Sequence, residues 1–220
     1  MKKVKTTILI ISLLLASKHL YSQTEYSIDD FSDTYFAKVI IDKKYKNEIF
    51  KKGTIVILTK KKKKKLIRVE TEEFVIDEDN KKSSCVSYPY GEQNVLIYQD
   101  LNFDGQKDFA IQDGQHSCYH GPSYQIFLKK GNAFLFSKEF TKLAQDYCGM
   151  FQIDYAKRQL KTTNKSGCCL FTTTTYRITN NIPQPILIIE EAFDPNTKIK
   201  TITTKKWKNG KMVSSVKMEK

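Results

Sequence analysis

The chain has 220 residues, a formal net charge of +13 and 40% hydrophobic residues, which is enough for one domain with a sizeable core. Its positive charge does not indicate nucleic-acid binding. The basic residues are almost all Lys, with Arg only at positions 68, 158 and 177, whereas recognition of bases and phosphates relies on the guanidinium group.

The N-terminal segment predicts export. Three lysines within the first five residues precede an apolar run over residues 8–16, and the small residue Ser22 follows. This order is typical of a signal peptide, and the apolar run is too short to span a bilayer. We expect cleavage after Ser22, which would leave residues 23–220 as a single periplasmic or secreted domain without a membrane span.

Short apolar runs separated by turn residues follow along the chain. They occupy residues 35–41, 55–58, 66–69, 95–98, 109–111, 124–128, 134–136, 151–155, 170–178 and 186–189. Asn209-Gly210 is a strong two-residue hairpin signal, and residues 141–147 are either a short helix or a loop. Strands at about 8–12-residue spacing predict an all-β antiparallel meander, which is either propeller-like or a β-sandwich.

Residues 60–65 are six consecutive lysines between two expected strands. Such a run is typical of a solvated hairpin tip. The alternative interpretation is a surface that attracts an anionic polymer or an acidic partner.

The most informative stretch is an acidic loop over residues 100–108, flanked by strands. Oxygen-bearing side chains alternate along it, and Gly105 permits a sharp turn. Calcium takes about six to eight oxygen ligands, and a loop of this spacing supplies most of them. The predicted Ca²⁺ ligands are Asp100, Asn102, Asp104, Gln106 and Asp108. An Asx-rich hairpin turn without a metal is the alternative.

Five cysteines in an exported chain favour disulfides and leave one thiol unpaired. If strands alternate in direction after the acidic loop, four of them gather at the end opposite that loop. These are Cys118, Cys148, Cys168 and Cys169. Adjacent cysteines pair only under strain, so we expect one or two bridges among these four, with the link from Cys148 to Cys168 or Cys169 favoured, and Cys85 as the free thiol.

Two histidines, His116 and His120, flank Cys118. They could form a zinc or copper site only if that thiol is free, and an ordinary polar loop is the favoured interpretation. No nucleophile elbow, His-Glu-x-x-His motif or phosphate-binding glycine loop is present. Adjacent acids such as those at 72–73 and 190–191 would face opposite ways on a strand, so we expect no catalysis.

The motif Asp-x-Asn-x-Asp-Gly-x-x-Asp at residues 100–108 resembles the calcium loops of FG-GAP/VCBS-type β-propeller repeats. With Gly-Pro-Ser-Tyr at 121–124 and Tyr-Arg-Ile-x-Asn-Asn at 176–181, it resembles a family of exported bacterial propeller-like proteins. Some members of that family bind calcium and are periplasmic inhibitors of lysozyme-like peptidoglycan hydrolases. The resemblance covers about residues 90–192 and implies a calcium-stabilised inhibitor or immunity protein.

We therefore expect a binding protein whose partner is a protein, and the resemblance suggests a lysozyme-like hydrolase. The candidate contact residues lie in one loop and are Tyr119, His120, Ser123 and Tyr124. Tyr side chains supply contact area at low entropic cost. A loop merely pinned by a disulfide is the alternative. The other function left open is a glycan- or cell-surface-binding module of a secreted assembly.

Overall fold

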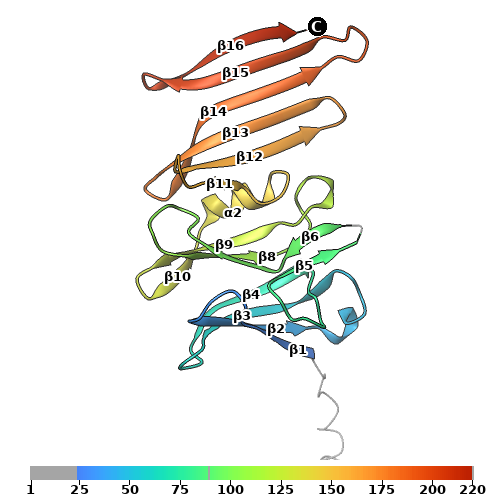
Figure 1. Cartoon of the computed structure of the whole chain (residues 1–220), viewed down its shortest axis with the longest axis vertical. Coiled ribbons are helices and arrows are strands. Elements are labelled where there is room, and N and C mark those ends of the chain that lie inside the picture. Colours follow the sequence, from blue (N-terminus) through green and yellow to red (C-terminus); the bar gives the residue numbers. More distant parts are fainter. Residues whose placement is uncertain (1–23, 89, 220) are drawn as a thin grey trace, which may run out of the picture.

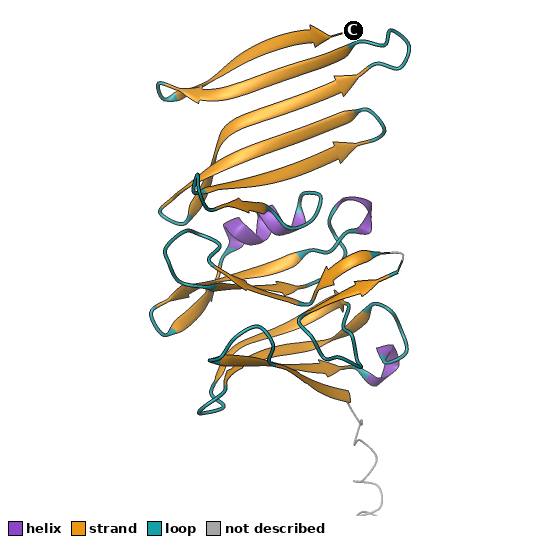
Figure 2. Cartoon of the chain, viewed as in Figure 1, coloured by secondary structure: helices purple, strands orange, loops and turns teal. Residues whose placement is uncertain are grey.

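A computed structural model describes residues 24–88 and 90–219, and the expected signal peptide over residues 1–22 lies outside them. The described residues form antiparallel sheets that follow one another in chain order, with only short helices between them (Figures 1 and 2). In the part of the chain that the structure describes, each sheet is open and has two edge strands. The predicted all-β antiparallel class is therefore confirmed.

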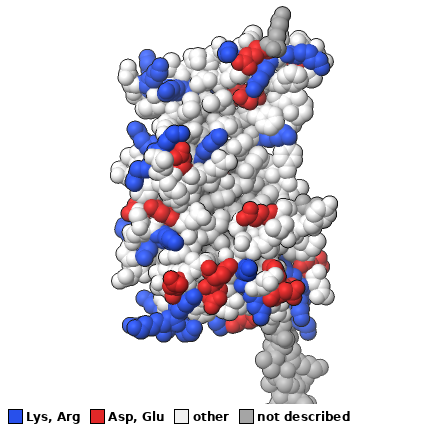
Figure 3. All heavy atoms as spheres, viewed as in Figure 1, with Lys and Arg blue, Asp and Glu red and all other residues white. Residues whose placement is uncertain are grey.

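The first sheet contains four strands in the order β1-β2-β3-β4. Their bounds are β1 Thr24–Ile28, β2 Tyr35–Ile41, β3 Lys51–Thr59 and β4 Lys65–Phe74, with a 3₁₀ helix η1 at Lys43–Tyr45. The lysine run turns the chain from β3 into β4, as predicted for a hairpin tip, and Lys63 adopts φ 52° within it. Figure 3 shows Lys and Arg at the lower end of the view, where this sheet lies, mixed with Asp and Glu, and further Lys and Arg along the left side and the upper end.

A small hairpin precedes the second sheet, whose order is β10-β9-β8-β7. The hairpin strands are β5 Ser84–Ser87 and β6 Gly91–Asn94, and the sheet strands are β7 Leu96–Gln99, β8 Asp108–Gln112, β9 Tyr124–Lys130 and β10 Ala133–Phe136. The 3₁₀ helix η2 spans Cys118–His120, and α2 spans Lys138–Gln145. The hydroxyl of Ser137 caps α2 by accepting a hydrogen bond from the Phe140 N–H (3.4 Å). The segment 141–147, left open as helix or loop, is helical as far as Gln145 and non-helical beyond it.

The third sheet is a meander in which each strand pairs with the next along the chain. Its strands are β11 Gln152–Asp154, β12 Gln159–Ser166, β13 Leu170–Thr179, β14 Ile182–Phe193, β15 Lys200–Lys208 and β16 Lys211–Glu219. Asn209 and Gly210 adopt φ 48° and 81° between the last two strands, which confirms the predicted two-residue hairpin.

All five residues of strand β8 are buried, so this strand lies inside the molecule and not at its surface. Successive side chains on a strand face opposite sides, so β8 contributes to two cores. Phe109 and Ile111 belong to the core shared with the first sheet, whereas Ala110 belongs to a second core with α2 and the third sheet. The loop that leads into β8 is consequently anchored between two packed layers.

Candidate functional sites: the acidic loop and the disulfide-held loop

The acidic loop over residues 100–108 joins β7 to β8 at the boundary of the second core. Leu101 is fully buried and Phe103 is 5% exposed, so alternate residues of the loop anchor it in the core. Gly105 has φ +86°, a conformation that L side chains rarely adopt, and it provides the sharp turn predicted from the sequence. The oxygen-bearing residues between these anchors are therefore kept together in one turn.

Backbone N–H groups inside the loop donate to its own side chains. The Asp100 carboxylate accepts hydrogen bonds from the N–H of Gly105 (2.9 Å) and of Asp104 (3.2 Å). Asn102 Oδ1 also accepts from the Asp104 N–H (3.1 Å), and Asp104 Oδ1 accepts from the Gln106 N–H (2.8 Å). These bonds are the Asx-turn pattern, in which short polar side chains stabilise a tight turn.

Asp108 lies at the end of the loop and is completely buried. Its Oδ2 accepts from the Leu101 N–H (2.8 Å) and its Oδ1 from the Lys129 N–H (2.7 Å). Burial raises the pKa of Asp108 to about 6; these two hydrogen bonds oppose the shift, and the charges of Asp104 and Asp100 add to it. The negative charges of Asp104 and Asp100 therefore act on the Asp108 carboxylate.

The donor set suits a hard cation because it consists of carboxylate and carboxamide oxygens, and a divalent ion would relieve the repulsion at Asp108. The five predicted ligands all belong to this one turn. However, residues 24–88 and 90–219 contain no group of three or more His, Cys, Asp or Glu arranged to hold a metal ion. Calcium in this loop, with the five ligands named from the sequence, stays a prediction.

The third sheet clamps the acidic loop from the side. Asn102 Nδ2 donates to Asn181 Oδ1 in the β13–β14 turn (3.0 Å), and the Tyr155 hydroxyl donates to the Asp100 carbonyl (3.2 Å). The Arg158 guanidinium donates to the Phe103 carbonyl and lies 5.7 Å from its ring centroid. Sequence reasoning missed these contacts. Asn181 was noted only as part of the motif at residues 176–181, and Tyr155 and Arg158 carry no signal beyond their place near a turn.

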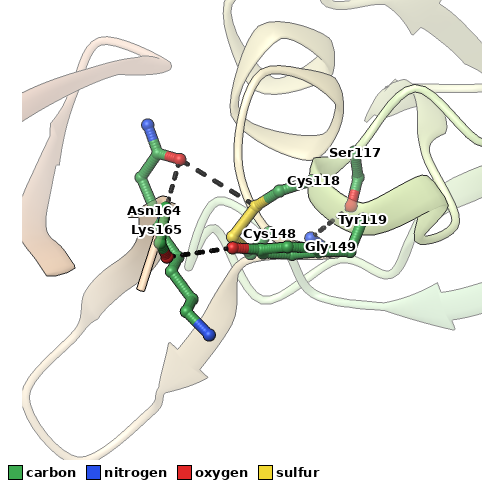
Figure 4. The surroundings of a disulfide bond; sticks show 8 residues. Ser117, Cys118, Tyr119, Cys148, Gly149, Asn164 and Lys165 are labelled. Carbon is green, nitrogen blue, oxygen red and sulfur yellow. Dashed lines mark hydrogen bonds between the residues drawn. A yellow bond between two sulfur atoms is a disulfide. The ribbon is translucent and has the colours of Figure 1, made fainter. Parts of the chain in front are cut away.

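Two disulfides lie at the other end of β13. Cys118 bonds Cys148, with a Cα–Cα distance of 4.7 Å (Figure 4), and Cys168 bonds its neighbour Cys169. The predicted link from Cys148 to Cys168 or Cys169 is wrong. The Gly149 N–H donates to the Ser117 hydroxyl (2.7 Å), and this bond holds the neighbouring Cys148 beside Cys118 at the start of η2. The gathering of four cysteines opposite the acidic loop is confirmed, as is the free thiol of Cys85.

The contact loop divides into exposed and buried residues. Tyr119 is 67% exposed and His120 is exposed, and both adopt positive φ (57° and 56°). Ser123 and Tyr124, which are 0% and 2% exposed, cannot contact a partner, so that part of the expectation is wrong. The Ser123 hydroxyl donates to the Asp113 carbonyl (2.8 Å). Tyr124 is the first residue of β9, and its ring packs in the second core.

Tyr119 is held against the tip of the β12–β13 hairpin. Its hydroxyl donates to the Gly167 carbonyl (3.3 Å), and Lys165 Nζ lies 5.2 Å from its ring centroid. The same ammonium lies 5.3 Å from the ring of Phe171, which is 40% exposed. Tyr119, Lys165 and Phe171, beside the Cys168–Cys169 bridge, therefore form one surface, which we call the Tyr119 surface. Figure 4 shows Tyr119 and Lys165 near the other bridge, Cys118–Cys148.

The histidines do not complete a metal site with the cysteine between them. Cys118 is bonded to Cys148, so it offers no thiolate. His116 Nε2 instead lies 3.5 Å from Glu72 Oε2, in a surface contact between half-exposed and exposed side chains. The adjacent acids Glu190 and Glu191 each form an ion pair with a lysine: Glu190 with Lys205 (3.0 Å) and Glu191 with Lys200 (3.2 Å).

Comparisons with known proteins show the fold alone. No protein-family model and no curated protein matches the sequence. One solved structure, described as a Xanthomonas protein related to a Type IV secretion system, matches with a TM-score of 0.67 and 18% identity, covering 90% of this chain and 94% of that one. Among the described residues, none of the helices has the length and apolarity needed to cross a bilayer.

Proposed function

We propose that this chain is an exported binding protein that recognises another macromolecule through the Tyr119 surface. The observation that supports this most directly is the combination of a 67% exposed Tyr119 with a backbone held by the Cys118–Cys148 bridge. An aromatic side chain that is fixed before binding loses little conformational entropy when it contacts a partner. Buried Tyr anchors of this kind commonly dominate the binding energy.

Calcium has a structural role in this proposal. Asp100, Asn102, Asp104, Gln106 and Asp108 would hold it, and the ion supplies positive charge to a turn that is otherwise crowded with carboxylates. The acidic loop and the Tyr119 surface lie at opposite ends of β13, because Asn181 follows that strand and Cys169 precedes it. The ion would therefore stabilise the sheet that carries the binding surface without contacting the partner itself.

The partner we propose is a peptidoglycan-cleaving, lysozyme-like hydrolase, which makes the chain a periplasmic inhibitor or immunity protein. The sequence resemblance supports this choice, and the solved neighbour related to a Type IV secretion system is consistent with an exported setting. We also interpret the successive antiparallel sheets as a propeller-like arrangement.

A glycan- or cell-surface-binding module is the second candidate. A groove of about 1090 Å³ on the third sheet favours it, because the aromatic rings of Tyr155 and Trp207 and the charged side chains of Lys161 and Arg177 help to line it. Aromatic rings and hydrogen-bonding groups in one groove suit a sugar ligand. The lysine run at residues 60–65 is a further surface that an anionic polymer could contact.

One pair of assays separates the two functions. An inhibitor should suppress a lysozyme-like hydrolase in solution, whereas a glycan binder should be retained on isolated cell-wall material. Tyr119→Ala should weaken inhibition at least about tenfold, while Tyr88→Ala, which removes a 94% exposed Tyr elsewhere, should leave it unchanged. Retention on cell-wall material without inhibition would favour the glycan binder. Equal inhibition by the Tyr119→Ala and Tyr88→Ala variants would reject the Tyr119 surface as the inhibitory site.

A further inference from the structure

Strand β16 is the outermost strand of the third sheet and lies at the opposite end of the molecule from β1 (Figure 1). Within the described residues it pairs with β15 alone, and none of its nine residues is buried. Val216 and Met218 are 60% and 70% exposed. A long, regular edge strand with exposed apolar side chains is a template for adding another strand.

The hairpin determines which backbone groups of β16 are free. Lys208 pairs with Lys211 across the two-residue turn, and such a closing pair exchanges both of its hydrogen bonds. The N–H and C=O groups of the odd-numbered residues from Lys211 onward therefore point to β15. Those of the four even-numbered residues point away from the sheet and are available to a further strand. They belong to Met212, Ser214, Val216 and Met218.

The sequence of β16 is complementary to itself in the antiparallel direction. When two copies pair about a twofold axis at Ser215, all nine residues are matched and the free even-numbered groups face each other. In this register Lys211 lies opposite Glu219 of the other copy at both ends of the pair. A shift by two residues toward the turn would instead place Lys211 opposite Lys217, and like charges directly opposite are destabilising.

The same register also places apolar side chains of the two β16 strands opposite each other. Met212 lies opposite Met218 of the other copy, and Trp207 is already the neighbour of Met212 on β15. Trp207 is 45% exposed, so the row from Trp207 through Met212 to the second Met218 would bury surface that one copy leaves open. Both the charges and the apolar residues thus match a second copy of this chain.

We propose that two copies of this chain associate through their β16 strands, paired antiparallel about Ser215, so that the two third sheets form one continuous sheet. The contact is isologous, as in most two-subunit proteins, because the same strand contributes from both sides. The contact is made by β16 alone. The Tyr119 surface is formed by η2, β12 and β13, so its residues are not part of this contact.

Charge exchange tests the register directly. Lys211→Glu places two carboxylates opposite each other in the pair, and Glu219→Lys places two ammonium groups opposite each other. Each variant alone should dimerise only at about tenfold higher concentration or more. An equimolar mixture restores both opposite-charge pairs and should form a mixed dimer. The mass is measured by light scattering over a range of concentrations.

Two further variants distinguish a loss of the β16–β16 contact from a loss of stability in the β15–β16 hairpin. Lys208→Glu relieves the same Lys208–Lys211 repulsion as Lys211→Glu but lies on β15, so it should dimerise like the original chain. Ser214→Pro removes an outward N–H without removing a bond to β15, and it should abolish the dimer. A chain that scatters as one copy (25.5 kDa for the full sequence) at all concentrations overturns the proposal, as does a dimer indifferent to Lys211→Glu and Ser214→Pro.

Discussion

Lys51 and Glu78 form an ion pair in which the lysine is almost completely buried: Nζ lies 2.6 Å from Oε1, and the Lys51 side chain is 6% exposed. The ammonium also donates to the carbonyls of Lys46 (2.7 Å) and Glu48 (2.8 Å), so all three of its protons are used. The hydroxyl of Tyr26 donates to the other oxygen of Glu78. One carboxylate therefore joins β1, β3 and the segment that follows β4.

Removing this carboxylate should destabilise the first sheet. Glu78→Gln leaves a buried ammonium without its counter-charge, and we expect the free energy of unfolding to fall by about 1–3 kcal/mol in chemical denaturation. Glu25→Gln is the matched control, because it breaks the exposed pair with Lys38 and should cost about 0.5 kcal/mol or less. Equal losses in the two variants would show that burial of Lys51 does not matter.

The same pair should contribute to acid sensitivity. Burial alone raises the pKa of Glu78, but the hydrogen bonds from Lys51 and Tyr26 outweigh it and hold the pKa below its usual 4.5. A group with a lowered folded pKa stabilises above its unfolded pKa, and that stability is lost as the pH falls through the folded value. Denaturation midpoints between pH 7 and pH 3 should therefore fall less steeply for Glu78→Gln than for the original chain. Parallel curves would contradict this prediction.

Calcium should raise the thermal midpoint. A ligand that binds only the folded state stabilises it by about 2.7 kcal/mol at a hundredfold excess over Kd, and EDTA should reverse the shift. Asp104→Ala should abolish most of the shift because it removes one carboxylate of the acidic loop, whereas Asp33→Ala, at an exposed carboxylate outside that loop, should retain it. Scanning calorimetry with calcium and with EDTA measures both. A thermal midpoint that changes with neither calcium nor EDTA would contradict the calcium assignment.

The Cys118–Cys148 bridge should stabilise the end of the molecule that carries Tyr119. It closes a loop with a sequence separation of 30 residues, and a native bridge of this kind contributes about 2–4 kcal/mol. The double variant Cys118→Ser/Cys148→Ser should lose that amount in chemical denaturation, while Cys85→Ser, at the free thiol, should lose little. Peptide mapping without reduction should find Cys118 linked to Cys148. Free thiols at both positions in exported protein would contradict the assignment.

Local features of the chain were predictable from its sequence. The alternation of apolar residues, the Asn209-Gly210 turn and the run of six lysines each act through the conformation of a few neighbouring residues. The all-β class, most strand positions and the hairpin tips followed from them. The acidic loop was equally visible, because its oxygen-bearing side chains and Gly105 lie within nine consecutive residues.

The tertiary structure decided what depends on distant segments. Cys148 pairs with Cys118 and not with Cys168 or Cys169, because the bond from the adjacent Gly149 N–H to the Ser117 hydroxyl places it beside η2. Tyr124 is polar at one end and aromatic, yet it is buried because it begins a strand that faces the second core. The Asn181 and Arg158 contacts to the acidic loop span 79 and 55 residues. Such pairings follow from how sheets pack on one another, and packing depends on the complete set of side chains rather than on any local pattern.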